Sequence, residues 1–228
     1  MTADGRHVRA IHRRLLHYYG ELEPPRRSDP LEELVLTVLS QNTSDANSFR
    51  AYASLRERFP TWEEVAAARP SQIAAAIRSG GLANVKAPRI LAILRAIRDR
   101  EGAFDLSFLR SMPDEAVREY LMSLPGVGPK TAAVVMAFSL GRDTLPVDTH
   151  VHRVARRLGL IPANTSAERA HEMLESRTPP DIRVPLHVGL IRLGRDLCKA
   201  GRPRCEVCPL KDLCPTARSI LGKSPRDA

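Results

Sequence analysis

The sequence predicts an all-α protein, and three observations carry this prediction. Apolar residues recur at helical spacing along most of the 228-residue chain, as in the run Ile90, Leu91, Ile93, Leu94 and Ile97. No stretch of useful length shows the apolar–polar alternation of a half-buried strand. The segments between the apolar stripes are short and rich in Gly, Pro and capping residues. We therefore expect helices of modest length joined by short connections.

In the first part of the chain, capping and stop signals define the helix ends. Ser28 or Asp29 is the expected cap of a helix beginning near Pro30, and Thr61 with Glu64 forms a capping-box pattern. Gly102 ends a long helix, and residues 23–30 look like a linker. The expected helices are 6–19, 31–39, 44–59, 61–68, 70–78 and 85–100.

In the second part of the chain, the run Pro125-Gly126-Val127-Gly128-Pro129 separates two expected helices, because its prolines and glycines do not continue the first one. Pro129 suits the first turn of a new helix, so the chain forms a helix, a tight hairpin and a second helix. Asp148 or Thr149 is the expected cap of the helix that follows, and residues 219–228 are polar and expected to be mobile. The expected helices are 114–122, 129–140, 150–158, 167–176 and 181–197.

The hairpin has a chemical consequence. The first amides of a helix have no partner within it, and together with the helix dipole they attract an anion. Gly126 and Gly128 lack side chains, so a phosphate can approach the backbone closely.

Net charge indicates the kind of partner. Lys and Arg number 35 against 26 Asp and Glu, a formal charge of +9, which favours a polyanion such as nucleic acid over a neutral ligand. A basic protein without such a partner is the alternative. Aromatic residues make up only 4% of the chain, which argues against a stacking platform for single strands. With no bilayer-spanning or signal segment in the sequence, we expect a cytoplasmic protein, nucleoid-associated if bacterial. We also expect the protein to be a monomer.

All four cysteines lie near the end of the chain, as Cys198-x6-Cys205-x2-Cys208-x5-Cys214. In a reducing compartment, four thiolates this close together are expected to hold a metal ion or a cluster. Zinc is the competing interpretation, although zinc sites more often pair two Cys-x2-Cys turns.

The run Leu-Pro-Gly-Val-Gly-Pro-Lys at 124–130, with Val-Asp-Thr-His at 147–150, resembles the helix-hairpin-helix DNA glycosylases. The lysine after the hairpin and the cysteine spacing resemble the endonuclease III branch of that family. The resemblance implies a structural [4Fe–4S] cluster and two helical lobes. One is a six-helix barrel over 31–143 with the hairpin motif at 114–140, and the other is a cluster lobe of 1–30 and 144–228.

The implied activity is that of a bifunctional DNA glycosylase and AP lyase, which excises oxidised pyrimidines from duplex DNA and nicks the strand. Such chemistry needs a nucleophile and a carboxylate near the sugar. The resemblance assigns these roles to Lys130 and Asp148. A phosphate contact for Lys130 and a simple N-cap for Asp148 are the alternatives. Two other hypotheses remain: a mismatch or alkylated-base glycosylase, and a non-catalytic DNA-binding module.

The remaining expected DNA contacts also come from the resemblance. Gln41 would enter the vacated base position and Leu82 would prop the opposite strand; a polar helix end and a core leucine are the ordinary alternatives. The family typically has Gln-x-Thr-Asp, whereas this chain has Gln-Asn-Thr-Ser-Asp at 41–45, which bears on base preference. The basic loop of residues 199–204 lies between the expected ligands Cys198 and Cys205. It would either bind a DNA phosphate or merely close the cluster site. The further expected DNA-contact residues are Gly126, Val127, Gly128, His150, Lys199, Arg202 and Arg204.

Overall fold

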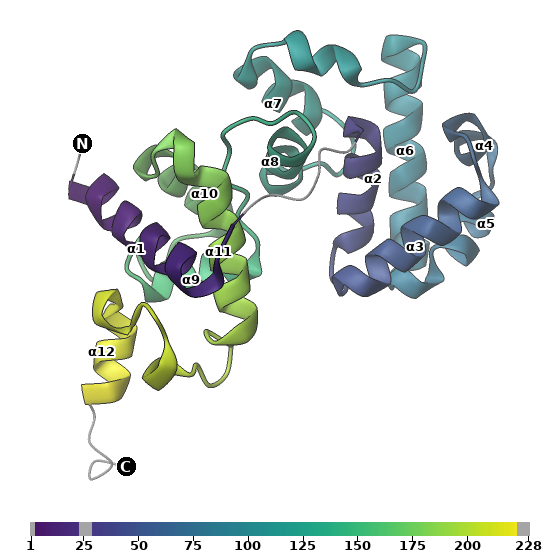
Figure 1. Cartoon of the computed structure of the whole chain (residues 1–228). Coiled ribbons are helices and arrows are strands. Elements are labelled where there is room, and N and C mark those ends of the chain that lie inside the picture. The colour runs from purple at the N-terminus through teal and green to yellow at the C-terminus, as the bar shows by residue number, and fades with distance from the viewer. Residues whose placement is uncertain (1–2, 23–28, 223–228) are drawn as a thin grey trace. The chain divides into compact units, whose positions relative to one another are not determined.

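The structure is a computed structural model that describes residues 3–22 and 29–222. All regular structure within these two ranges is helical, in agreement with the all-α prediction. The chain forms two compact units (Figure 1), which we call the hairpin unit (Arg26–Arg142) and the cysteine unit (Met1–Pro25 with Asp143–Ala228). The linker expected at 23–30 lies largely outside the described residues.

The hairpin unit is built around α2, which packs against α3, α6 and α8. Apolar side chains on nearly every side of α2, among them Leu34, Val35 and Val38, are fully buried in one hydrophobic core. A helix that is apolar all round must be enclosed by others. The helices are α2 (Pro30–Ser40), α3 (Asp45–Arg58), α4 (Trp62–Ala67), α5 (Pro70–Ala76), α6 (Ala83–Glu101), α7 (Asp114–Met122) and α8 (Pro129–Phe138), with 3-10 turns at Arg78–Gly80 and Ser107–Ser111.

Local capping explains where these helices begin. The Asp29 carboxylate accepts hydrogen bonds from the amides of Leu31 and Glu32, and Pro30 occupies the first helical position. At α4, Thr61 accepts from the Glu64 amide at 3.2 Å. The helix expected over 70–78 ends earlier, at Ala76, and a 3-10 turn follows. Gly81, directly after this turn, has a φ of +68°, which glycine adopts without the steric cost of a side chain.

The cysteine unit is organised around α11, which packs against α9 and α1. Gly189 of α11 faces Leu15 and Leu22, and a Cβ there would lie 3.0 Å from the Leu15 side chain. A larger residue would therefore push α1 away from α11. The helices are α1 (Ala3–Tyr19), α9 (Thr149–Arg157), α10 (Ala167–Arg177), α11 (Arg183–Asp196) and α12 (Pro215–Gly222), with 3-10 turns at Pro180–Ile182, Cys205–Val207 and Lys211–Leu213.

The end of the chain corrects one expectation. Residues 219–222, expected to be part of a mobile tail, belong to helix α12. Ala217 of that helix is 1% exposed, and its amide donates to Cys214 Sγ, so burial and the neighbouring cysteine loop order this segment. Residues 223–228 lie outside the described residues.

Candidate active site

The hairpin connects α7 to α8 through a compact turn. The Leu124 amide donates to Leu121 O and the Val127 amide to Leu124 O, while Gly126 adopts the left-handed conformation with φ of +73°. Val127 is 6% exposed and anchors the turn in the core. A Cβ at Gly128, the N-cap of α8, would meet nothing within 4 Å, so the start of α8 has open space in front of it. This matches the geometry expected of a phosphate site at a helix N-terminus.

Lys130 lies in the first turn of α8, directly after Pro129. The residue is half-buried, whereas the following residues Thr131 to Ala137 are buried and fix the helix in the core. Because the helix is held in the core, the Cα position of Lys130 is fixed. The flexible side chain lets the amine move from that fixed point. This is suitable for a nucleophile and also for a phosphate contact.

Asp148 is the N-cap of α9, in extended conformation with φ of −93° and ψ of −177°. Its Oδ1 accepts the Val151 amide at 2.7 Å, which identifies Asp148 rather than Thr149 as the cap. Among the described residues, Oδ2 has no hydrogen-bond partner. The cap therefore fixes the carboxylate at the helix start and leaves one oxygen for a substrate.

Gln41 is the C-cap of α2, and its side chain is oriented by a residue that the sequence analysis did not identify. Arg89 on α6 donates from Nη1 to Gln41 Oε1 at 2.7 Å. The same arginine lies against the hairpin, since a Cβ at Gly126 would fall 2.7 Å from Arg89 Nε. Arg89 thus contacts both the Gln41 segment and the hairpin turn.

Lys86, also unrecognised from the sequence, is buried with 2% exposure. Its ammonium donates to Leu39 O and to Gly80 O, both at 2.7 Å. These carbonyls lie two residues before Gln41 and two residues before Leu82. Burial lowers the pKa of Lys86 from its ordinary value, because the charged form is removed from water. One side chain thus ties together the segments that carry two expected DNA contacts.

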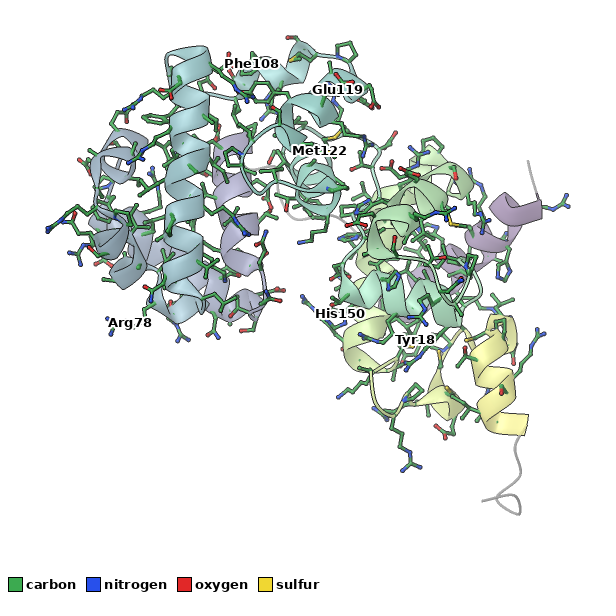
Figure 2. All side chains as sticks on the ribbon, turned by 180° about the vertical axis from the view of Figure 1, so that it is seen from behind. Tyr18, Arg78, Phe108, Glu119, Met122 and His150 are labelled. Atoms are coloured by element: carbon green, nitrogen blue, oxygen red, sulfur yellow. The ribbon has the colours of Figure 1, made fainter. Side chains whose placement is uncertain are left out.

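Leu82 is 53% exposed, which excludes the core-leucine alternative. It occupies the left-handed region, with φ of +48° and ψ of +34°, at the N-cap of α6. This conformation is unfavourable for leucine by about 1–2 kcal/mol, and such strain clusters at functional sites. The leucine lines a surface pocket together with Arg78 and Val85. Figure 2 shows Arg78 extending outward at the end of the unit where α6 starts.

The two histidines after Asp148 differ. His150, labelled in Figure 2, faces Arg153 on its own helix, with Nδ1 at 3.1 Å from Arg153 Nη2. It also packs on Gly194 of α11, where a Cβ would lie 2.9 Å from His150 Cβ. His152 Nε2 contacts Thr165 O at 2.8 Å, so this histidine joins α9 to the segment before α10.

The four cysteines line one pocket in the cysteine unit, together with Leu193, Leu197 and Ala217. The pKa values of Cys205, Cys208 and Cys214 are raised, chiefly by burial and further by the neighbouring thiols. Among the described residues, no group of three or more His, Cys, Asp or Glu side chains is arranged to hold a metal ion. Four spaced thiols around an apolar pocket are the donor set that an iron–sulfur cluster needs.

The loop between Cys198 and Cys205 exposes Lys199, Arg202 and Arg204 to solvent. Arg157 of α9 holds its backbone, donating to Lys199 O at 2.7 Å and to Ala200 O at 2.9 Å. The cations of the loop are therefore presented from a fixed backbone.

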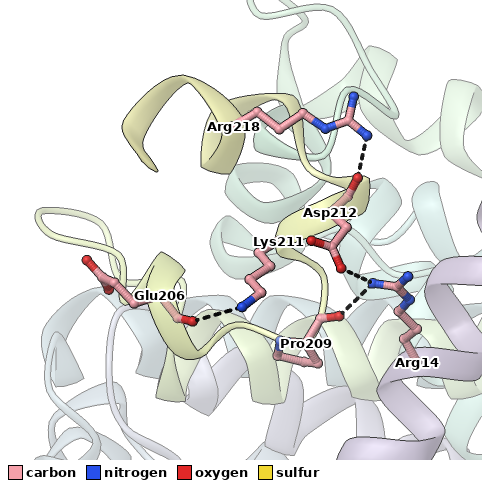
Figure 3. A network of polar contacts seen from close by, with 6 residues as sticks. All are labelled: Arg14, Glu206, Pro209, Lys211, Asp212 and Arg218. Carbon is pink, nitrogen blue, oxygen red and sulfur yellow. Dashed lines mark hydrogen bonds and ion pairs between the residues drawn. The ribbon is translucent and has the colours of Figure 1, made fainter. Parts of the chain in front are cut away.

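The second cysteine loop, from Cys205 to Cys214, is held by hydrogen bonds from α1 and from α12 (Figure 3). Arg14 of α1 donates to Pro209 O and Asp212 Oδ2, both at 3.2 Å, and Arg218 of α12 donates to Asp212 O. Lys211 reaches Glu206 O within the loop at 3.5 Å. The cysteine loops are thus anchored to the helices around them.

The predicted site residues fall into two sets. Gln41, Leu82, the hairpin glycines and Lys130 belong to the hairpin unit. Asp148, His150, the four cysteines and the basic loop belong to the cysteine unit.

Comparison with known proteins identifies the family. Residues 35–180 match the model of the HhH-GPD superfamily base excision DNA repair proteins. The chain belongs to this superfamily. Residues 198–214 match the iron–sulfur binding domain of endonuclease III, so this HhH-GPD protein has an iron–sulfur binding domain at the end of the cysteine unit.

Relatives and solved structures agree with this placement. Endonuclease III of Thermotoga maritima is 37% identical over 189 residues, covering 83% of this chain and 84% of the relative. Endonuclease III of Bacillus subtilis is 34% identical, with 82% and 81% covered. A trapped endonuclease III–DNA covalent intermediate matches with a TM-score of 0.83 at 29% identity, covering 97% of this chain and all of the other. A thermostable thymine-DNA glycosylase, at 22% identity and a TM-score of 0.80, shares the fold.

These findings confirm the predicted helix-hairpin-helix glycosylase fold and the enzyme class. This HhH-GPD protein is a DNA glycosylase and AP lyase of base excision repair, and duplex DNA is its partner. The hypothesis of a non-catalytic DNA-binding module is wrong. No helix in residues 3–22 and 29–222 is long and apolar enough to cross a membrane.

Proposed function

We propose that this protein excises oxidised pyrimidines from duplex DNA and then nicks the strand, with Lys130 as nucleophile and Asp148 as the catalytic carboxylate. The observation that carries the proposal is the placement of both residues at helix starts: Lys130 in the first turn of α8 behind the hairpin, and Asp148 as the cap of α9. The relatives named endonuclease III support this reading.

The proposed chemistry begins when the damaged nucleotide leaves the base stack, since an enzyme cannot reach a glycosidic bond inside the duplex. The neutral Lys130 amine attacks the sugar C1′, the bond from C1′ to the base breaks, and the base departs with the electron pair. The Asp148 carboxylate stabilises the positive charge that develops on the sugar during this step. The hairpin amides and the basic loop hold the flanking phosphates.

Strand cleavage follows from the covalent intermediate. Opening of the sugar ring gives an imine between Nζ and C1′, which makes the C2′ protons acidic. Loss of one C2′ proton with departure of the 3′ phosphate breaks the C3′–O bond, and hydrolysis of the imine then releases the enzyme. Gln41 would occupy the space of the extruded base, and Leu82 would support the opposite strand.

For the cluster we propose the [4Fe–4S] type, held by Cys198, Cys205, Cys208 and Cys214. When bound, it supplies a covalent link between the two cysteine loops and takes no part in base excision. A brown protein with broad visible absorption is expected, whereas colourless protein containing zinc would contradict this. Because its substrate is genomic DNA, we place the protein in the cytoplasm, at the nucleoid if the host is bacterial.

Asp148→Asn tests the catalytic carboxylate without removing the helix cap, because asparagine caps helices as well as aspartate does. We expect base excision to fall by several orders of magnitude while DNA affinity and thermal stability stay near wild type. Unchanged excision by this variant would rule out the carboxylate role.

A second candidate substrate class is mismatched or alkylated bases. The Gln41–Asp45 segment motivates it: the aspartate comes one position later than in the family pattern, and Asn42 adopts φ of +54°. A panel of duplexes, each with one lesion, separates the two classes. Faster excision of a mismatched or alkylated base than of an oxidised pyrimidine would favour the second class.

A further inference from the structure

The segment that leads into Asp148, residues 143–147, has no regular secondary structure, yet most of it is buried. Leu145 is fully buried and Val147 is 4% exposed. A buried backbone outside a helix or sheet must find hydrogen-bond partners elsewhere, because an unpaired buried amide or carbonyl is costly. The structure shows where this segment finds them.

Two side chains of α10 accept the amides of the segment. Glu175 Oε1 accepts from the Leu145 amide at 3.1 Å, and His171 Nε2 accepts from the Val147 amide at 3.0 Å. The two acceptors are four residues apart, one helical turn, and the two amides are two residues apart. Pro146 between them has no amide to satisfy.

Two side chains of α11 donate to carbonyls of the same segment. Arg183 Nη1 donates to Asp143 O at 2.9 Å, and His187 Nδ1 donates to Pro146 O at 2.7 Å. These donors are again one helical turn apart. Arg183 also donates to Glu175 O at 2.7 Å and to Thr178 O at 3.1 Å, so it joins α10 to α11 at this point.

His171 and His187 are both buried, at 5% and 4% exposure. Their backbone partners require one to accept a hydrogen bond and the other to donate one. An amide can only donate, so His171 Nε2 must carry a lone pair. A carbonyl can only accept, so His187 Nδ1 must carry a proton. Each histidine thus recognises one backbone group of the Pro146–Val147 peptide, directly before Asp148.

We propose that His171, Glu175, Arg183 and His187 are positioning residues that hold residues 143–147 in one conformation and thereby place the Asp148 carboxylate. The inference rests on the proposed catalytic role of Asp148. The N-cap bond fixes the carboxylate only relative to α9, whereas these four side chains fix the chain that enters α9. Catalytic groups must be held within about 0.5 Å of the productive geometry, which a single cap bond does not provide.

His171→Leu and His171→Gln test the proposal as a matched pair. Leucine fills the site without an acceptor, while the glutamine amide oxygen can accept the Val147 amide. The readouts are the single-turnover excision rate at saturating enzyme, hydrogen exchange of the Val147 amide, and the melting temperature. We expect His171→Leu to lower the rate by about 10–100-fold, the scale of a 1 Å misplacement, and to speed exchange at Val147. His171→Gln should restore slow exchange and most of the rate.

Three results would overturn the proposal: a His171→Leu rate within two-fold of wild type, unchanged exchange at Val147, or a rate loss that glutamine does not relieve. If His171→Leu does not fold, Glu175→Leu and Glu175→Gln form an equivalent pair, read at the Leu145 amide by the same criteria. Asp148→Asn in the same assay keeps the two claims apart. Full activity in that variant removes the catalytic role itself, whereas an inactive Asp148→Asn beside a fully active His171→Leu removes only the positioning role.

Discussion

Replacing Lys86 by methionine removes the ammonium that joins the end of α2 to the turn before α6. Methionine has a similar length and fills the same volume, but it cannot donate to Leu39 O and Gly80 O. Each carbonyl left buried without a donor costs about 1–3 kcal/mol. Methionine carries no charge, so the free-energy cost of burying the ammonium is also removed, and this offsets part of the loss. The two penalties together amount to about 2–6 kcal/mol, and after the offset we expect the free energy of unfolding to fall by about 2–4 kcal/mol.

Urea unfolding of wild type and Lys86→Met measures this difference, and Arg95→Met is the control. Arg95 is an exposed cation on the same helix, and surface substitutions of this kind change stability by less than about 0.5 kcal/mol. Hydrogen exchange should accelerate around residues 39–43 and 80–86 in Lys86→Met and nowhere else in the hairpin unit. Stability within about 0.5 kcal/mol of wild type would show that Lys86 does not hold these segments.

The pH dependence of the same pair gives an independent check. Burial lowers the folded-state pKa of Lys86, so below the ordinary lysine pKa the unfolded chain binds more protons than the folded chain. The stability of wild type relative to Lys86→Met should therefore increase as the pH rises from the lowered pKa towards the ordinary value near 10.4. A difference that is constant with pH would contradict the assigned cause.

Three further predictions concern Gly81, the neighbouring Leu82 as the wedge that would support the opposite strand, and the basic loop between Cys198 and Cys205. Gly81→Ala should destabilise the protein by about 1–3 kcal/mol in urea unfolding, because φ of +68° with ψ of +161° is a region essentially restricted to glycine; an unchanged midpoint would contradict this. Leu82→Ala should leave the melting temperature nearly unchanged, since the side chain is half exposed, but lower single-turnover excision from duplex DNA at least ten-fold; equal excision would remove the wedge role. Arg157→Met should weaken DNA binding and hasten loss of visible absorption under a chelator, because the Cys198–Cys205 loop loses its backbone anchor; unchanged binding and bleaching would refute the anchoring role.

Much of the fold was predictable because its signals are local. Asp29, Ser44 and Ser166 cap helices through their own side chains, and each lies directly before the helix that it starts. Helix α12 was missed for the opposite reason: it is short, and burial of Ala217 stabilises it through tertiary contact. Tertiary packing decides such marginal helices, and a single sequence does not display it.

The supporting residues around the site were harder to predict than the expected contacts themselves. Lys86 resembles a solvated helix residue in the sequence, yet its partner Leu39 lies 47 residues earlier in the chain. Arg89 likewise reaches Gln41 across 48 residues. The spacings of His171 with Glu175 and of Arg183 with His187 were a visible one-turn pattern, but nothing in the sequence indicated that both pairs face the segment before Asp148.

The most direct test of the catalytic assignment is borohydride trapping on duplex DNA that contains one abasic site, with wild type beside Lys130→Gln. Reduction converts the imine between Lys130 Nζ and C1′ into a stable amine, so the covalent complex can be seen on a denaturing gel. We predict a covalent adduct with wild type and none with Lys130→Gln, although both proteins bind the duplex. An adduct of equal yield in the variant would assign the Schiff base to another amine. No adduct from wild-type protein that excises bases would make Lys130 a phosphate contact.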